Sequence, residues 1–300
     1  MSILVKTPGP LTTVQDEGRF FHQSSGIRPS GVMDVAAYEA ANALVGNENG
    51  EAVLEMTFLG ATLEFQSAAW FAVTGADMQV KLDGAPVERY RAIHAEAGQT
   101  LAFGMAANGC RGYFAVRGGI DVPLVMGSRS TDMSAKLGGF EGRPLKAGDV
   151  LPTIPDGGWT PSDLRYDLPV YESAAEVRVI PGPQEDFFTA AGLDTFFSTG
   201  YEISPESDRM GLRLEGAVIE SVGSTDIVSD GIVFGSIQVT SGGKPIILMA
   251  DHQTAGGYAK IGTVLSLDLP KLAQARPGDT VRFVRISAED AQALYDTTLC

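Results

Sequence analysis

Polar residues of several chemical types follow an apolar run in the C-terminal half of the chain. The run Pro245 to Met249 is typical of a buried strand, and Asp251-His252-Gln253-Thr254-Ala255-Gly256-Gly257-Tyr258 begins two residues later. A rigid strand that ends in a loop of donors and acceptors is a common support for a polar site. The glycine pair predicts a turn, because glycine adopts backbone conformations that other residues avoid. This segment is therefore a candidate site.

The side chains of this segment suit different chemical roles. Asp251 and His252 are candidate catalytic bases, since a carboxylate or an imidazole can take a proton from a reacting group. An orienting hydrogen bond is an equally good interpretation of His252. Gln253 and Thr254 are neutral donors suited to holding a carbonyl or an amide, Gln253 as a catalytic and Thr254 as a substrate-binding residue. The other predicted substrate-binding residues here are Gly256, Gly257 and Tyr258, although a glycine pair also occurs in tight turns without a ligand.

The N-terminal half repeats this arrangement. Gly118-Gly119-Ile120-Asp121-Val122-Pro123 leads through the apolar residues 124–126 into Gly127-Ser128-Arg129-Ser130-Thr131. Both stretches align as a glycine pair, a predicted apolar strand and a polar loop that ends in threonine. Arg129 is predicted to be a catalytic charge clamp, with Ser130 and Thr131 as substrate-binding neighbours.

Two further arginines stand near aspartates and glycines. Like Arg129, the residues Arg19 and Arg209 are candidates for bidentate binding of carboxylate, carbonate or phosphate. An aspartate and an arginine on one loop can also fasten two turns together. For Asp16 with Arg19, and for Asp208 with Arg209, this structural interpretation is favoured over a catalytic one.

Asp34 has two interpretations. It precedes the alanine-rich run Val35 to Val45, which ends at Gly46, so it is predicted to be the N-cap of a helix. It also ends the polar stretch Pro29-Ser30-Gly31-Val32-Met33. Asp34 is therefore also included with Arg19 and Arg209 in the candidate substrate-binding set.

Landmarks recur in the same order in both halves of the chain. Pro8-Gly9-Pro10 matches Pro181-Gly182-Pro183, and Gly148-Asp149-Val150 matches Gly278-Asp279-Thr280. Together with the two polar loops and a looser match of 59–63 to 214–219, they predict two related units.

The predicted units are residues 1–151 and 177–300. Residues 152–176 are rich in proline, glycine and aspartate, which disfavour helix and strand interiors, so they are predicted to connect the units. In a duplicated protein equivalent loops can face each other across an interdomain cleft. We therefore expect Arg129 and Gln253 to face one shared pocket.

Short apolar runs separated by glycine and proline predict a strand-rich fold. Asp83-Gly84, between two such runs, is a hairpin signature. Helices are predicted to be few and short: Asp268 precedes one at 269–275, and Ser287 with Asp290 resembles a capping box. The predicted fold class is mostly β, with barrels or sandwiches favoured.

Composition excludes several protein classes. A chain of 300 residues with 44% hydrophobic and 20% charged residues is typical of a soluble globular protein. A net charge of -15 argues against a nucleic-acid-binding surface, which needs a basic face. The sequence has neither a signal-peptide core nor a run of membrane-span length, and its two cysteines give no disulfide framework. The expected location is the cytoplasm.

Familiar catalytic motifs are absent from the sequence. It has no G-x-x-x-x-G-K-[ST] loop, no G-x-G-x-x-G after a strand and no G-x-S-x-G elbow. Its three histidines occur without paired cysteines or an H-E-x-x-H helix, so no protein-held metal is expected. The candidate chemistry therefore lies in the polar loops.

Taken in order, these loops resemble the biotin-dependent carboxyltransferase family, also called allophanate hydrolase subunit 2. That family includes the Kip antagonist protein and the C subunit of bacterial 5-oxoprolinase. The motifs that carry the resemblance are Val14-Gln15-Asp16-x-Gly18-Arg19, Pro29-Ser30-Gly31-x-Met33-Asp34, Gly118-Gly119-Ile120-Asp121-Val122-Pro123, Gly127-Ser128-Arg129-Ser130-Thr131, Ser207-Asp208-Arg209-Met210-Gly211 and Asp251-x-Gln253-Thr254-x-Gly256-Gly257-Tyr258. The match extends to about Phe283. It departs from the family at Ala255, where a second threonine is usual, at Ala259, where a proline is usual, and near Phe21, where a glycine is usual.

The resemblance implies a fold and partners. It implies a pair of related cyclophilin-like β-barrel domains. It also implies assembly with a Kip-inhibitor-like protein, also called allophanate hydrolase subunit 1, and in 5-oxoprolinase with a third subunit of the LamB/YcsF type. The substrate would be a small amide or lactam.

Two chemistries compete within the family. As the C subunit of an ATP-dependent 5-oxoprolinase, the chain would help to open 5-oxoproline to glutamate, with Arg129, Gln253 and Thr254 as donors to developing negative charge. As a urea or allophanate-type carboxyltransferase, it would pass a carboxylate from carboxybiotin to an amide nitrogen, with Asp251 or His252 as the base. The absence of a biotinyl A-M-K-M-like segment favours the first alternative, in which the complex uses ATP at a location that the sequence does not give.

A third alternative belongs to another functional class. A noncatalytic regulator, like the Kip antagonist, would bind and sequester a kinase inhibitor. The acidic composition and the lack of an evident nucleophile are compatible with this role.

Overall fold

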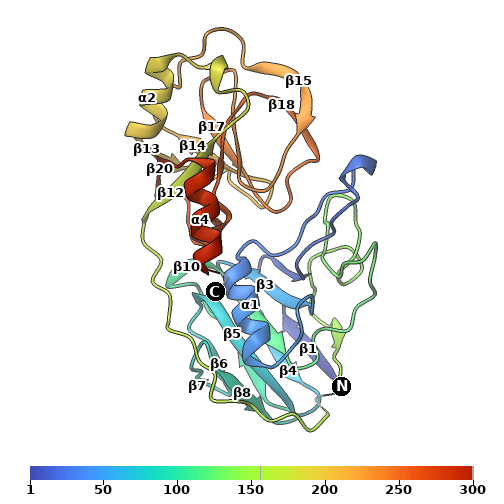
Figure 1. Cartoon of the computed structure of the whole chain (residues 1–300). Coiled ribbons are helices and arrows are strands. Elements are labelled where there is room, and N and C mark those ends of the chain that lie inside the picture. The colour runs from blue at the N-terminus through green and yellow to red at the C-terminus, as the bar shows by residue number, and fades with distance from the viewer. Residues whose placement is uncertain (156, 299–300) are drawn as a thin grey trace. The chain divides into compact units, whose positions relative to one another are not determined.

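The chain folds into two units that are rich in strands. The structure is a computed structural model that describes residues 1–155 and 157–298. It divides into a first unit, Met1–Tyr171, and a second unit that begins at Glu172 (Figure 1). Strands far outnumber helices in both, so the predicted mostly β fold class is confirmed.

The first unit consists of two sheets. The first has the strand order β11-β1-β4-β9-β6-β7 and the second the order β2-β3-β10-β5-β8. The elements are β1 (Ser2–Thr7), β2 (Thr12–Gln15), α1 (Val35–Leu44), β3 (Val53–Thr57), β4 (Thr62–Phe65), β5 (Ala69–Asp77), β6 (Lys81–Leu82), β7 (Ala85–Pro86), β8 (Ala92–Ala95), β9 (Thr100–Ala102), β10 (Asn108–Val116) and β11 (Val150–Pro152), with a short 3-10 turn at Gln23–Ser25.

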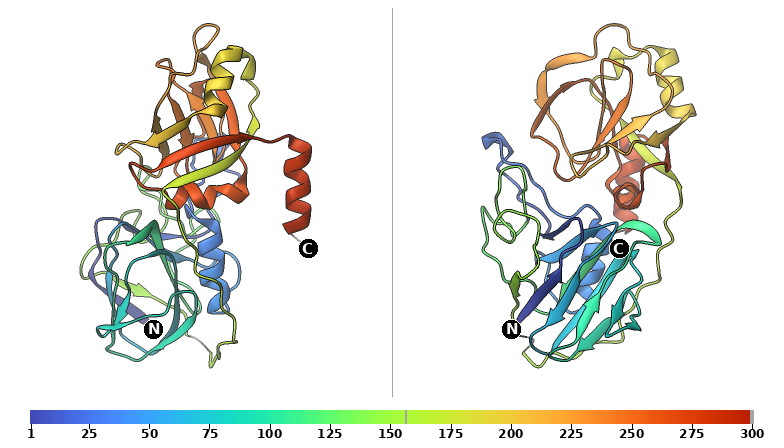
Figure 2. Two further views of the ribbon diagram at one scale, coloured as in Figure 1. Left: turned by 90° about the vertical axis from the view of Figure 1, so that its left-hand side faces the viewer. Right: turned by 180° about the vertical axis from the view of Figure 1, so that it is seen from behind.

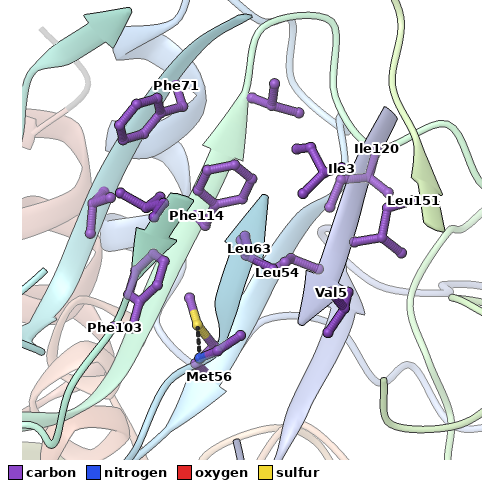
Figure 3. Close-up of a cluster of buried hydrophobic side chains, with 14 of the residues drawn as sticks. Ile3, Val5, Leu54, Met56, Leu63, Phe71, Phe103, Phe114, Ile120 and Leu151 are labelled. Atoms are coloured by element: carbon purple, nitrogen blue, oxygen red, sulfur yellow. Dashed lines mark hydrogen bonds between the residues drawn. The ribbon is translucent and has the colours of Figure 1, made fainter. Parts of the chain in front are cut away.

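One apolar core is shared by the two sheets of the first unit. Phe114 of β10 lies at its centre, with ring centroids 5.9 Å from Phe71, 6.2 Å from Phe65 and 6.4 Å from Phe103 (Figure 3). Aromatic rings at these separations add packing energy beyond the area that they bury. The core fixes the strands whose ends carry the polar loops.

Helix α1 packs against the five-stranded sheet. Its alanine-rich face contacts β5 and β10, so that this sheet is buried on both sides (Figure 1). The carboxylate of Asp34 accepts a hydrogen bond from the Ala37 backbone N–H, which confirms the predicted N-cap. The predicted hairpin is confirmed as well, because Asp83 and Gly84 connect β6 and β7 with positive φ angles of 48° and 84°.

The second unit is a closed barrel. Its strands follow one another in the order β12-β19-β16-β17-β14-β13-β20, and β12 closes the barrel by parallel pairing with β20 (Figure 2). The elements are β12 (Ala174–Pro181), α2 (Ala190–Ser198), β13 (Gly200–Ile203), β14 (Gly211–Glu215), β15 (Asp226–Gly231), β16 (Ser236–Val239), β17 (Pro245–Leu248), β18 (Ala255–Tyr258), β19 (Lys260–Val264), α3 (Leu269–Gln274), β20 (Thr280–Arg285) and α4 (Ala288–Thr298), with 3-10 turns at Glu185–Phe187 and Ser266–Asp268. Strands β15 and β18 form a separate two-stranded ribbon.

Helices of the second unit confirm some local predictions and add one element. Ser287 and Asp290 form the expected capping box of α4, with hydrogen bonds between their side chains and to the Asp290 backbone N–H. Helix α2 was not predicted. Thr189 caps it, and the Phe196 ring stacks on Phe283 of β20 at a centroid distance of 4.4 Å.

Much of the segment predicted to connect the units packs on the first one. Trp159 lies 6.0 Å from Trp70 between ring centroids, and its indole fills the space beside Gly46. Asn108 holds the end of the segment, since its side chain donates to the Tyr171 carbonyl and accepts from the Tyr171 N–H. Cys110 is buried in β10, whereas Cys300 lies outside the described residues.

Asp268 joins α3 to the barrel. It accepts hydrogen bonds from the backbone and guanidinium of Arg178 in β12 and pairs with Lys271, instead of capping the helix with its side chain. Burial acts to raise the pKa of Asp268, but the hydrogen bonds from Arg178 and Lys271 outweigh it and leave the pKa below its ordinary value of 3.8.

We predict that Asp268 makes folding stability depend on acid pH. A carboxylate whose pKa is lowered in the folded state stabilises the protein above pH 3.8, and this contribution is lost as the pH falls through the folded pKa. Asp268→Asn should therefore lower stability at pH 7 and flatten the pH dependence below about pH 4. Urea unfolding between pH 2 and pH 7 checks this. If the free energy of unfolding of the variant depended on pH as steeply as that of the wild type, the prediction would be contradicted.

Candidate functional site

The Asp16 carboxylate organises the polar loop of the first unit. Asp16 directly follows β2, and its Oδ1 accepts hydrogen bonds from the hydroxyls of Ser128 and Ser130 and from the Gly18 N–H. Its Oδ2 accepts from the backbone N–H of Arg129 at 2.5 Å, and its own N–H donates to Ser130 Oγ. A buried carboxylate with so many donors fixes a loop that is more than a hundred residues away in sequence.

This arrangement determines where Arg129 lies. Arg129 Nε donates to the Val122 carbonyl at 3.2 Å, and Nη1 lies 3.7 Å from Glu51 Oε2. The side chain is 18% exposed, so part of it can meet a ligand. The predicted role of Arg129 as a charge clamp stays a prediction that is compatible with this position.

Arg19 lies inside the first unit. It is fully buried, with Nε donating to the Val125 carbonyl and Nη2 to the Ser130 carbonyl. Burial lowers the pKa of the Arg19 guanidinium from its ordinary value, while Asp16 and Asp132 act in the opposite direction. Arg19 therefore holds the 125–130 loop by its backbone carbonyls, as a structural residue would. The predicted partner was different, because the guanidinium donates to these carbonyls instead of pairing with Asp16.

Ser130 and Thr131 are also engaged by the protein. Ser130 Oγ bonds to Asp16, and Thr131 Oγ1 donates to the Val14 carbonyl. Gly139 must lack a side chain, because a Cβ there would overlap the Thr131 hydroxyl. In this arrangement both hydroxyls serve the packing of the loop, and their substrate-binding role remains a prediction.

The apolar stretch before this loop is not the strand that the alignment of the two halves predicted. Val125 and Ser128 form an isolated bridge around a tight turn, in which Met126 has a positive φ of 53°. Leu124 and Met126 are exposed. The strand prediction was wrong because Arg19 draws the Val125 carbonyl inward, which favours a turn over pairing in a sheet.

Arg209 and Asp251 form a buried ion pair in the second unit. Arg209 Nε and Nη2 donate to the two carboxylate oxygens of Asp251 at 2.9 and 3.0 Å, and the Asp251 N–H donates to the Arg209 carbonyl. Asp208, expected to pair with Arg209, instead accepts from the N–H groups of Met210 and Gly211. The predicted partner was wrong, since a local turn satisfies Asp208 and the bidentate geometry selects Asp251.

The loop after this pair presents residues of unequal exposure. His252 is buried, with Nδ1 2.6 Å from the Gln253 carbonyl, whereas the Gln253 side chain is exposed and Thr254 is half-buried. Action of Asp251 as a base would require breaking its pair with Arg209. The geometry thus leaves Gln253 and Thr254 as the residues of this loop that reach solvent.

The glycine pair lies in a strand and not in the predicted turn. Gly256 and Gly257 belong to β18, which pairs with β15, and Tyr258 ends that strand. A Cβ on Gly256 would lie 2.5 Å from the side-chain nitrogen of Gln238, which donates to the Tyr258 carbonyl. Close approach to Gln238, and not a left-handed backbone, accounts for glycine here.

Sequence reasoning missed Lys260, which follows this strand. Its buried ammonium donates to Asp230 Oδ2 at 2.5 Å and to the Gly231 carbonyl, which joins β15 to the barrel strand β19. The Lys260 hydrogen bond is the main cause that lowers the pKa of Asp230. The sequence around Lys260 gave no signal for this contact, because its partner lies thirty residues earlier in the chain.

Asp34 sits in a buried polar network and not at a surface. Its N–H donates to the Tyr113 hydroxyl, which donates in turn to Glu55 Oε2. Burial, followed by the charge of Glu55, raises the pKa of Tyr113 well above its ordinary value. Asp34 is therefore placed to cap and anchor α1, and a role in binding substrate remains a prediction.

The described residues were compared with the requirements of a metal site and of a membrane-spanning helix. Nowhere in residues 1–155 and 157–298 do three or more His, Cys, Asp or Glu side chains gather as metal ligands would. Among these same residues, no helix combines the length and the apolar character that crossing a bilayer requires. The predicted pocket shared by Arg129 and Gln253 stays a prediction, with Arg129 in the first unit and Gln253 in the second.

Comparisons with known proteins place this mostly β chain in a class of group-transfer domains. The model of the family "Carboxyltransferase domain, subdomain A and B" matches residues 25–285. The chain is 40% identical to the C subunit of Escherichia coli 5-oxoprolinase over 285 residues, which cover 94% of this chain and 91% of that protein. It is 39% identical to the C subunit of Haemophilus influenzae 5-oxoprolinase over 94% of this chain and 90% of that protein.

A solved structure extends the likeness to the coordinates. The Kluyveromyces lactis urea carboxylase matches with a TM-score of 0.91 and 31% identity, over 99% of this chain and 28% of that much longer chain. The chain therefore belongs to the carboxyltransferase domain family, whose relatives here are subunits or parts of enzymes.

We predict that Asp16→Ala destabilises the first unit by about 3 kcal/mol, because it leaves buried hydroxyls and a buried N–H without an acceptor. Asp167→Ala removes an exposed carboxylate and should change stability by less than about 0.5 kcal/mol. Urea unfolding of both variants measures the difference. Equal stabilities would mean that Asp16 does not hold the loop.

We predict that Arg209→Met costs about 3 kcal/mol of folding stability, because it leaves the Asp251 carboxylate buried without its partner. Arg282→Met, at an exposed position of the same unit, is the matched control and should have little effect. Thermal and urea unfolding check this. A loss of similar size in the control would show that arginine packing, and not the ion pair, is responsible.

Proposed function

We propose that this protein is the C subunit of an ATP-dependent 5-oxoprolinase, which opens 5-oxoproline to glutamate. The observation that carries the proposal is 40% identity to a protein of that name along nearly the full length of both chains. The proposed partners are a Kip-inhibitor-like (allophanate hydrolase subunit 1) protein and a LamB/YcsF-type third subunit. Because the reaction consumes ATP, we place the complex in the cytoplasm.

The chemistry requires donors to developing negative charge. Opening a lactam requires activation of its carbonyl, and the resulting oxyanion is stabilised by preorganised donors. Arg129 and Gln253 with Thr254 are partly or fully exposed and suit this role. The chain has no glycine-rich phosphate loop, so ATP is assigned to the complex and no step is assigned to it in this chain.

A second candidate is a biotin-dependent carboxyltransferase of the urea carboxylase type. The likeness to the K. lactis urea carboxylase, with a TM-score of 0.91, favours it. In that reaction biotin would deliver the carboxylate, and the same donors would stabilise the ureido oxygen of biotin as charge develops there. The lower sequence identity, 31% against 40%, makes this the second choice.

Reconstitution tests the proposal. The chain, purified with both partners, should release glutamate from 5-oxoproline only when ATP is present. Absence of glutamate with all three proteins would contradict the proposal. Carboxylation of an amide by added carboxybiotin would then support the second candidate, and inhibition by this chain of the partner's action on a kinase would support a regulatory role.

We predict that Arg129→Ala lowers turnover of the assembled complex by at least about 100-fold, the usual effect of removing a donor to a developing oxyanion. Assembly should persist, because the Arg129 side chain makes a hydrogen bond at 3.2 Å and a long ion-pair contact of 3.7 Å to Glu51, while Asp16 holds its backbone independently of the side chain. Arg165→Ala, at an exposed position of the connecting segment, is the control. Glutamate release and gel filtration measure both effects. Failure of Arg129→Ala to fold would make this arginine architectural.

A further inference from the structure

The first unit contains a cavity that no sequence motif indicated. It measures about 530 Å³ and lies between the segments 121–125 and 136–142, with Pro152 at one side. A volume of this size is within the usual range of small-molecule sites. Its walls are apolar at Val122, Val125, Leu137 and Phe140, and charged side chains stand among its lining residues. The cavity thus offers an apolar interior with polar groups for orientation.

Both walls of this cavity are fastened to the arginines of the polar loop. On one wall, Arg129 holds the Val122 carbonyl and Arg19 holds the Val125 carbonyl. On the other wall, the Gly139 N–H donates to the Arg129 carbonyl, and Gly138 packs against the Arg19 guanidinium so closely that a Cβ would clash. Because Arg19 contacts both walls with its side chain, and Arg129 contacts one with its side chain and the other with its backbone carbonyl, the cavity is preorganised before any ligand arrives.

The loop 136–142 is held in an unusual backbone conformation. Lys136 and Glu141 have positive φ angles of 55° and 58°, as do the glycines at 138, 139 and 142. Residues with side chains rarely adopt this conformation, and its cost is typically found at ligand sites. Arg143 supports the loop, since it pairs with Asp149 and Glu141 and lies 5.2 Å from the Phe140 ring centroid.

The 136–142 wall of this cavity favours an anion. Lys136 lines it with an ammonium that has no ion-pair partner among the described residues, whereas the carboxylate of Glu141 is paired with Arg143 and that of Asp121 belongs to the opposite wall. In the same part of the chain, the backbone N–H groups of Phe140 and Glu141 make no hydrogen bond. Successive N–H groups beside left-handed residues form an anion-binding concavity. A carboxylate can therefore bind there with its apolar body between the walls.

We propose that this cavity binds a small ring-containing carboxylate, with the carboxylate at Lys136 and the loop amides and the ring between Val122, Leu137 and Phe140. The ring identity rests on the proposed function, in which the ligand is the cyclic amide 5-oxoproline. Lys136 is then a specificity-determining residue, because it would distinguish a lactam with a carboxylate from one without.

Titration calorimetry with the full chain and with the assembled complex tests the proposal. 5-Oxoproline should bind, whereas 2-pyrrolidone, which has the same ring without the carboxylate, should bind at least about tenfold more weakly. Lys136→Asn keeps a residue that tolerates the left-handed backbone and removes the charge. It should weaken 5-oxoproline about tenfold and leave 2-pyrrolidone unchanged.

A matched variant completes the test. Lys146→Asn removes an exposed lysine of the same unit outside the cavity and should leave binding unchanged. Equal weakening by Lys136→Asn and Lys146→Asn would overturn the site, and so would the absence of 5-oxoproline binding to the chain and the complex.

The site and the proposed function can fail separately. Turnover by the complex with an affinity independent of Lys136 overturns the cavity and leaves the oxoprolinase function standing. Absence of turnover, together with Lys136-dependent binding of 5-oxoproline or a related ring carboxylate such as benzoate, overturns the function and supports the cavity. Comparison of kcat with KM in Lys136→Asn adds a further reading, because loss of a binding contact should raise KM with little change in kcat.

Discussion

A single buried carboxylate holds the candidate site of the first unit together. The Asp16 carboxylate accepts hydrogen bonds from the hydroxyls of Ser128 and Ser130 and from the backbone N–H of Arg129. These bonds fix the loop that carries Arg129. Burial makes these hydrogen bonds strong, and it makes an unpaired member costly, so the loop has one favourable arrangement. The placement of Arg129, the course of 121–125 and the cavity behind it all depend on this arrangement.

In the second unit, different residues fix the polar loop. There a buried aspartate, Asp251, is paired side by side with Arg209, and the exposed Gln253 and Thr254 follow directly. In both units charged groups with good geometry fix the loop, while neighbouring residues are left to meet solvent. Several residues whose side chains could act in catalysis therefore make structural contacts instead. The residues next to them are better placed to contact a ligand.

Local sequence signals predicted those features whose cause is local. The Asp34 cap, the Asp83-Gly84 turn and the Ser287–Asp290 capping box each involve residues a few positions apart. Contacts between distant segments were not predictable in this way. Asp16 finds its serines more than a hundred residues later, Arg209 prefers Asp251 to the adjacent Asp208, and Gly256 is explained only by Gln238 on another strand. The cavity was missed for the same physical reason, since its two walls, residues 121–125 and 136–142, are joined by the contacts that Arg19 and Arg129 make with both segments.

Hydrogen exchange at the Arg129 amide tests the central claim most directly. If the Asp16 carboxylate fixes the loop, this N–H exchanges slowly in the native protein, and in Asp16→Asn it exchanges at least about tenfold faster while the amides of β10 keep their protection. Unchanged protection of Arg129 in Asp16→Asn would contradict the account.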